Sequence, residues 1–171
     1  MYAMASDIHI KVLNLNTTMK ITKISKKGLD LIKSFEGFRS APYADIVGVN
    51  TIGYGNTYYP GGKKVTLQDS PITEEEATKL LLNTLTYYEQ SVDSLVRDDI
   101  SQNKYDSLVS FAYNLGVNAL KKSTLLKLVN ENPNNHLIKD EFLKWCNAGG
   151  RKVSGLVKRR TKEVEHFFSV V

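Results

Sequence analysis

The chain has 171 residues, of which 42% are hydrophobic and 24% charged, and its formal net charge is +5. This length and composition fit one domain, or one domain with two lobes, that is large enough to bury a core. No stretch reaches the about 18 consecutive apolar residues of a membrane span, and no apolar leader segment opens the chain, so we expect neither stable membrane insertion nor a secretory signal. The basic balance favours polyanionic partners such as nucleic acid, anionic lipid or an acidic cell wall.

The first 19 residues are the least certain part of the sequence. Ile8, Ile10 and Val12 alternate with polar neighbours, a pattern typical of a strand. Met19 stands immediately before the region with stronger patterns, so residues 1–19 are either an added strand or an extension of uncertain origin. We expect the folded domain to cover residues 20–171.

A first helix is predicted over residues 25–36, with Ser25 as its N-cap and Gly37 as its stop. Glu36 lies four positions after Ile32 and therefore shares the apolar face of this helix. The negative end of the helix dipole and partial burial both disfavour the ionised carboxylate, so both raise the pKa of Glu36, as a general acid requires. Considered alone, the helix fits a solvated surface Glu better, because most Glu side chains are exposed.

The next residues favour the catalytic interpretation. Short β-branched and aromatic segments with Gly between them, from Pro42 to Gly55, predict small twisted strands joined by tight turns. Asp45 would lie on the first strand or its turn, and Thr51 on the following strand. Such a hairpin cannot bury both faces, so one face can line a cleft opposite the helix that ends at Glu36. Residues 63–65 are expected to form a last strand after a Pro-Gly-Gly turn.

The remainder is predicted to be helical. Thr73 and Glu76 form a capping box at the start of a long helix that would connect the strands to a helical lobe. A second helix is expected from Ser101 to Gly116, and further helices are expected over residues 120–129, 134–145 and 154–168. Within the last of these, Glu163 lies one turn from Lys158-Arg159-Arg160, which indicates a structural ion pair.

Three ordered blocks resemble the phage-type lysozymes, the endolysins or muramidases of glycoside hydrolase family 24. In the first block, eight residues separate Glu36 from Asp45, and five residues separate Asp45 from Thr51. The sequence Ile-Gly-Tyr-Gly follows Thr51 directly. The other blocks are residues 107–116, similar to the central helix of the family, and the stretch from Trp145 to Glu163, similar to its C-terminal signature. The resemblance covers residues 20–168. One departure is Asn56, where many relatives carry His.

The resemblance implies an α+β lysozyme fold. A small β lobe over about residues 37–70 would be joined by a long helix to a helical lobe over about 71–171, which includes the first helix, and a cleft would separate the lobes. It implies hydrolysis of the β-1,4 bond between N-acetylmuramic acid and N-acetylglucosamine, with no cofactor and no metal. The implied catalytic residues are Glu36 as general acid, Asp45 to position or activate water, and Thr51 to hold that water. The implied substrate-binding residues are Tyr43, Tyr54, Asn56 and Asn114.

Two other functions stay open at this point. A lytic transglycosylase cuts the same bond without water, although Asp45 and Thr51 count against it. A non-catalytic cell-wall or nucleic-acid binding protein would make the carboxylates incidental, which their spacing disfavours, so we expect no nucleic-acid partner. For an endolysin without a signal we expect a monomer that waits in the host cytoplasm until a holin-type membrane protein releases it to the wall in the periplasm.

Overall fold

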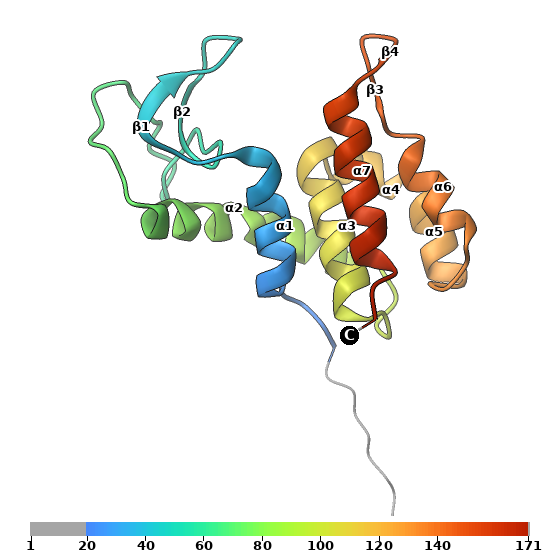
Figure 1. Cartoon of the computed structure of the whole chain (residues 1–171). Helices are drawn as coiled ribbons and strands as arrows, with labels where there is room; N and C mark the ends of the chain where they lie inside the picture. Colours follow the sequence, from blue (N-terminus) through green and yellow to red (C-terminus); the bar gives the residue numbers. More distant parts are fainter. Residues whose placement is uncertain (1–19, 171) are drawn as a thin grey trace, which may run out of the picture.

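A long helix connects two lobes of different construction in the computed structural model, which describes residues 20–170 (Figure 1). The segment 1–19, with the alternating Ile8, Ile10 and Val12, and residue 171 lie outside the described residues. The elements follow in the order α1 (Lys26–Glu36), β1 (Arg39–Ala44), β2 (Asn50–Gly53), α2 (Glu74–Leu95), α3 (Gln102–Leu115), α4 (Val117–Lys121), α5 (Thr124–Glu131), α6 (Leu137–Leu143), β3 (Asn147–Ala148), β4 (Arg151–Lys152) and α7 (Ser154–Phe167).

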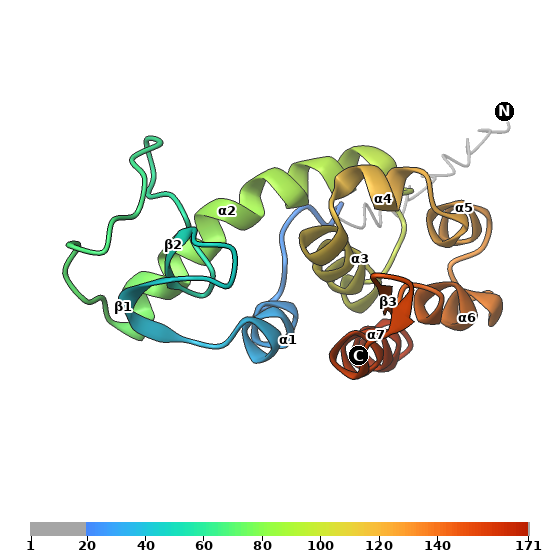
Figure 2. The ribbon, with the colours of Figure 1, turned by 90° about the horizontal axis from the view of Figure 1, so that it is seen from above.

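The long helix α2 runs from beneath the strands to the helical side of the molecule, as Figures 1 and 2 both show. The predicted capping box starts it: the Thr73 hydroxyl accepts a hydrogen bond from the Glu76 amide, and the Glu76 carboxylate accepts one from the Thr73 amide. On α2, Ala77, Leu81 and Leu85 are completely buried. This helix is therefore the frame on which both lobes are built, and the predicted α+β arrangement is confirmed.

The β lobe is a two-stranded antiparallel sheet in which Tyr43 pairs with Thr51. The expected last strand over residues 63–65 does not form, which corrects the prediction. Lys64 makes only an isolated bridge with Tyr58, because the chain reverses sharply through Gly61 and Gly62, both at positive φ. The turn is formed as expected, and its two arms are joined by backbone hydrogen bonds from Tyr59 to Lys63 and from Val65 to Thr57, which is less than a strand ladder.

The helical lobe is arranged around α3, whose side chains are buried on nearly every face. The helix expected over residues 120–129 is two helices, α4 and α5. Ser123 separates them because its hydroxyl accepts a hydrogen bond from the Leu126 amide and so caps α5. The helix expected over 134–145 is shortened to α6, because Asn132 and Asn135 side chains bond nearby amides in the preceding turn. The last helix, α7, agrees with the prediction to within one residue.

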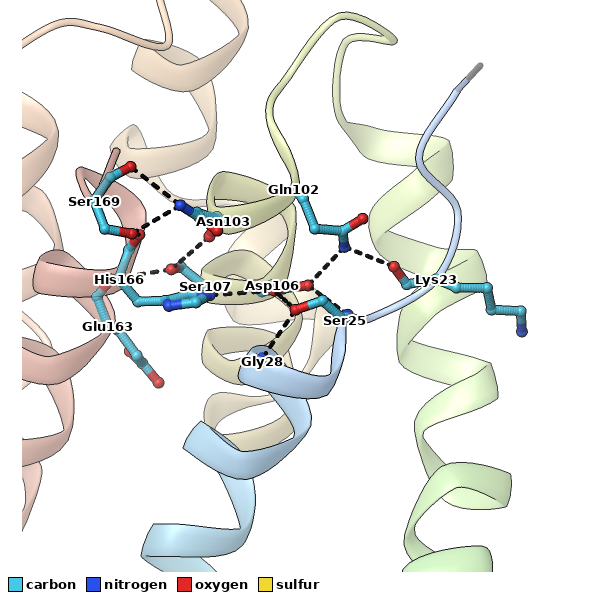
Figure 3. Close-up of polar contacts among 10 residues, drawn as sticks. All are labelled: Lys23, Ser25, Gly28, Gln102, Asn103, Asp106, Ser107, Glu163, His166 and Ser169. Atoms are coloured by element: carbon cyan, nitrogen blue, oxygen red, sulfur yellow. Dashed lines mark hydrogen bonds and ion pairs between the residues drawn. The ribbon is translucent and has the colours of Figure 1, made fainter. Parts of the chain in front are cut away.

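Helix α1 approaches α3 closely at one position. A Cβ atom added at Gly28 would lie 2.5 Å from Cγ of Asp106, so only glycine fits there. The fully buried Asp106 carboxylate then accepts hydrogen bonds from the Ser25 amide at 2.9 Å and the Ser25 hydroxyl at 2.5 Å (Figure 3). His166 Nε2 on α7 lies 3.1 Å from the same carboxylate, and Gln102 donates to it at 2.8 Å. One acidic side chain thus joins α1, α3 and α7.

The protonation of Asp106 is coupled to folding. Burial raises the pKa of its carboxyl group, but the hydrogen bonds from His166, Ser25 and Gln102 together outweigh burial, and the pKa lies below its ordinary value. A folded-state pKa below the unfolded one contributes stability at pH values above the unfolded pKa. This contribution is lost as the pH falls through the lowered, folded-state pKa.

We predict that Asp106→Asn lowers the free energy of unfolding at pH 7 by about 1.5–3 kcal/mol, the scale of hydrogen bonds to a charged group. An amide offers one acceptor oxygen and turns an NH₂ group toward the remaining donors. Urea unfolding at pH 7 and at about pH 3 measures the effect. The gap between wild type and variant should narrow at the lower pH, because the unfolded wild-type chain then binds a proton at Asp106 that folding has to release.

The exposed Asp140, changed to Asn, is the matched control and should leave stability unchanged at both pH values. A gap between wild type and Asp106→Asn that stays constant with pH would show that Asp106 contributes through packing and not through its charge.

Candidate active site

Glu36 ends α1, where Gly37 at φ 70° stops the helix. The Glu36 side chain is 23% exposed. Oε1 accepts a hydrogen bond from Arg159 Nη1 at 2.7 Å, and Oε2 faces the β lobe, since a Cβ added at Gly55 would lie 3.9 Å from it. The carboxylate therefore stands between α7 and the β lobe, with one oxygen bound and the other directed at the loop that follows β2.

The arginine that binds Glu36 belongs to a buried charge cluster. Arg159 Nε also lies 3.3 Å from Glu163 Oε1, and Arg160 Nε lies 2.8 Å from Glu163 Oε2. The Ser110 hydroxyl on α3 donates to Glu163 at 2.7 Å. The predicted ion pair between this basic segment and Glu163 is thereby confirmed, and it involves both arginines, whereas Lys158 is exposed.

Asp45 and Thr51 are placed by the turn that joins β1 to β2. Asp45 Oδ1 accepts hydrogen bonds from the amides of Val47 at 2.9 Å and Val49 at 2.8 Å. The Thr51 hydroxyl, 4% exposed as a residue, donates to the Val49 carbonyl oxygen at 3.0 Å. Asp45 therefore organises the turn through one oxygen, and Thr51 is tied to the same turn through Val49.

Two hollows are lined by neighbours of Glu36. One, of about 230 Å³, is lined by Gly55 and by Asn56, Thr57, Tyr58 and Thr84. The other, of about 330 Å³, is lined by Arg159 and by residues of α1, α3 and the start of α7, among them Phe35, Asn114 and Leu156. Neighbours of the carboxylate thus line a hollow on the β-lobe side, through Gly55, and another on the α7 side, through Arg159.

The four expected substrate-binding residues have different environments. Tyr43 is half-buried under the Arg39 guanidinium group, whose central carbon lies 4.3 Å from the ring centroid. Asn114 is half-buried, lines the larger of the two hollows, and accepts a hydrogen bond from Arg160 Nη2 at 3.0 Å. Both side chains can be reached from solvent.

The other two are internal. Tyr54 is 3% exposed, packs in the core, and donates its hydroxyl hydrogen to Glu74 Oε1 at 2.7 Å. Asn56 is 4% exposed and donates from Nδ2 to the Thr84 hydroxyl at 2.9 Å. Asn56 therefore joins the β lobe to α2 with an uncharged hydrogen bond.

The family model described as phage lysozyme matches residues 33–163, which span the helix end with Glu36, the turn with Asp45 and Thr51, and the buried arginine cluster. The chain belongs to the phage lysozyme family. The resemblance found in the sequence is thereby confirmed.

Individual relatives of this phage lysozyme family member agree with the match. It is 44% identical over 142 residues to an endolysin of Bacillus phage B103, covering 82% of this chain and 52% of the relative, so the chain spans about half the length of that protein. It is 37% identical to the endolysin of Salmonella phage P22, covering 86% of this chain and 99% of the relative. The solved endolysin of Escherichia coli O157:H7 phage FAHEc1 is 35% identical, with a TM-score of 0.79 over 87% of this chain and 95% of that one.

Other relatives carry a different name. A protein of Bacteriophage PS119 called SAR-endolysin is 34% identical over 128 residues, covering 75% of this chain and 73% of that protein. Between residues 20 and 170, no helix of the present structure has both the length and the apolar character that crossing a membrane demands.

The contact between Arg159 and Glu36 was missed by sequence reasoning. The two residues are 123 positions apart, and only the packing of α1 beside α7 brings them together. The sequence does contain a weak indication of this contact. Two adjacent arginines precede a single carboxylate, Glu163, by one helical turn, so one guanidinium group can pair with a second acidic residue.

We predict that Arg159→Met lowers the free energy of unfolding by up to about 3 kcal/mol. This is the lower end of the cost of removing one partner from a buried ion pair, and we expect the lower end because Arg160 still pairs with Glu163. Chemical denaturation of Arg159→Met, Glu163→Gln and the double variant gives the coupling energy. Additive losses in this cycle would mean that the two side chains do not stabilise each other. Lys162→Met, an exposed position on the same helix, is the control.

Proposed function

We propose that this protein is an endolysin that hydrolyses the β-1,4 bond between N-acetylmuramic acid and N-acetylglucosamine in bacterial peptidoglycan. The observation that carries this proposal is the position of Glu36. Its carboxylate is partly exposed, is fixed at one oxygen by Arg159, and directs the other oxygen at the lobe that carries Asp45 and Thr51. A proton donor on one side and a second carboxylate on the other are what glycoside hydrolysis requires.

Glu36 is proposed as the general acid. The Arg159 hydrogen bond restricts the rotation of its carboxyl group, which leaves Oε2 as the atom that can give a proton to the leaving sugar oxygen. We assign Arg159 as a positioning residue, since it acts through Glu36. Glu163, itself bound by Arg160, accepts a hydrogen bond from Arg159 Nε and so helps to hold the arginine side chain in place.

Asp45 and Thr51 are proposed to handle the attacking water. Asp45 uses Oδ1 to accept two turn amides, and in residues 20–170 no side chain forms an ion pair with it, so Oδ2 can accept a proton or a hydrogen bond from water. The Thr51 hydroxyl gives its hydrogen to Val49 and keeps its lone pairs for a water hydrogen. Tyr43 and Asn114, which solvent can reach, are proposed sugar contacts, and Asn56 is proposed to support the floor of the smaller hollow.

We predict that Glu36→Gln lowers the rate of cell-wall lysis by at least about 10²–10⁴-fold, the usual contribution of general acid catalysis. The amide keeps the oxygen that Arg159 binds, so the melting temperature should change little. A turbidity assay on permeabilised cells measures lysis, and the exposed Glu165→Gln serves as control. Retained lysis in Glu36→Gln would refute the assignment.

The configuration of the first product separates hydrolysis from its closest alternative. If Asp45 directs water at the face opposite Glu36, the first product should have the inverted, α configuration, which proton NMR detects during early turnover. A first product with β configuration would instead give Asp45 the role of nucleophile. An anhydro sugar end would identify a lytic transglycosylase, which needs no water at Asp45.

The cellular setting belongs to the same proposal. We propose that the protein acts as a monomer, without cofactor, and is held in the host cytoplasm until a separate holin-type membrane protein gives it access to the wall. The name SAR-endolysin among its relatives supports a link between release and the membrane within the family. The net charge of +5 supports attraction to an acidic wall.

A further inference from the structure

Three side chains from three segments meet between the last turn of α1, the loop after β2 and the start of α2. One oxygen of Glu74, Oε1, accepts a hydrogen bond from the Tyr54 hydroxyl at 2.7 Å and another from Lys33 Nζ at 3.0 Å. Lys33 Nζ also lies 4.9 Å from the centroid of the Tyr54 ring. Each of the three side chains therefore contacts the other two. They are named here the Glu74 cluster.

The Glu74 cluster lies beside the proposed acid in the sequence and in the fold. Lys33 precedes Glu36 by one helical turn on α1. Tyr54 directly precedes Gly55, the residue that faces Glu36 Oε2. Glu74 is the first residue of α2, which carries both lobes. The helix that ends at Glu36 and the loop that faces it are thus tied to the same oxygen atom on α2.

The cluster keeps one protonation state near neutral pH. Hydrogen bonds from Tyr54 and Lys33 hold the pKa of the Glu74 carboxyl group below its ordinary value. Tyr54 and Glu74 raise the pKa of the Lys33 ammonium group, and burial raises the pKa of the Tyr54 hydroxyl. Tyr54 is 3% exposed and the Lys33 side chain 19% exposed, although Glu74 itself is largely exposed. A carboxylate, an ammonium group and a neutral hydroxyl therefore persist together.

The last turn of α1 is held from two directions. Arg159 belongs to α7 and relates Glu36 to the helical lobe. Lys33 relates the same turn of α1 to α2 and, through the Glu74 oxygen, to the β lobe. In the proposed reaction the proton donor and the residue that handles water lie on different lobes. Their separation therefore depends on contacts of the second kind.

We propose that the Glu74 cluster sets the position of the β lobe relative to Glu36, and with it the geometry in which Glu36 and Asp45 act on one sugar bond. The inference rests on the proposed function and adds a set of residues to it. Lys33, Tyr54 and Glu74 are positioning residues, because they act through Glu36 and through the loop that faces it.

The test compares Glu74→Ala with Glu75→Ala, a matched control that removes the same charge from the same turn of α2. Glu75 is exposed and pairs with Lys79. Glu74→Ala removes the oxygen that Tyr54 and Lys33 share. On purified peptidoglycan strands it should lower kcat by about 10-fold, since a misplacement of 1 Å can cost about 10²-fold. KM should stay unchanged, and Glu75→Ala should alter neither constant.

Two conservative variants separate positioning from a purely structural role, with all rates expressed per folded enzyme. Glu74→Gln keeps an acceptor oxygen and should recover part of the lost kcat. Tyr54→Phe keeps the ring and removes only the hydroxyl, so it should lower kcat less than Glu74→Ala does. The double variant Tyr54→Phe with Glu74→Ala should lose no more than Glu74→Ala alone. The loss of kcat should be the same from about pH 5 to 8, where the cluster does not titrate.

Three results would overturn the inference. The first is an unchanged kcat of folded Glu74→Ala with a lower melting temperature, which would make the cluster purely structural. The second is an equal loss of kcat for Glu74→Ala and Glu75→Ala, which would identify the charge at the start of α2 as the cause. The third is an additive loss in the double variant with Tyr54→Phe. A wild-type enzyme that does not cleave the strands would instead refute the proposed function, so the two failures are distinguishable.

Discussion

The buried Asp106 carboxylate is the contact on which the geometry of the helical lobe depends. It joins the first residues of α1 to α7 through Ser25 and His166. The same two helices meet again where Glu36, at the far end of α1, binds Arg159 on α7. Because α1 is held at both ends, its last residue cannot turn or slide independently of α7. The position of the proposed acid is therefore set in part by a buried contact one helix length away.

The β lobe is placed by contacts with α2. Gly53 packs on this helix so closely that a Cβ there would lie 3.0 Å from the Cβ of Ala77, and Gly55, at φ 90°, brings the following loop opposite Glu36. The same helix holds the segment before α1, since Glu89 accepts a hydrogen bond from the Ile24 amide at 2.8 Å. A single helix thus fixes the loop that faces the proposed acid and the approach to the helix that carries it.

The parts that sequence predicts well are those fixed by local rules. Helix α1 has the expected bounds because Ser25 and Gly37 are strong end signals, and the Arg–Glu163 pair lies within one helical turn. Contacts between distant segments could not be predicted, because they depend on how helices pack. The Arg159–Glu36 contact needs α1 beside α7, and the burial of Tyr54 needs α2 behind the β lobe. One helix was predicted across Ser123 because apolar residues continue at helical spacing on both sides of it. The Ser123 hydroxyl caps α5 instead, and this divides the segment into two helices.

The proposed acid and the proposed water site are held by different kinds of interaction. Glu36 depends on side chains far apart in the sequence, whereas Asp45 is oriented by amides two and four residues ahead of it in a turn whose tip, Ile46 and Val47, is fully or largely exposed. The placement of Asp45 is therefore a property of the turn and not of the core. Val49 belongs to this turn and also lines a hollow of the β lobe. Substitutions in this turn can therefore alter the placement of Asp45 while the core that orients Glu36 stays intact.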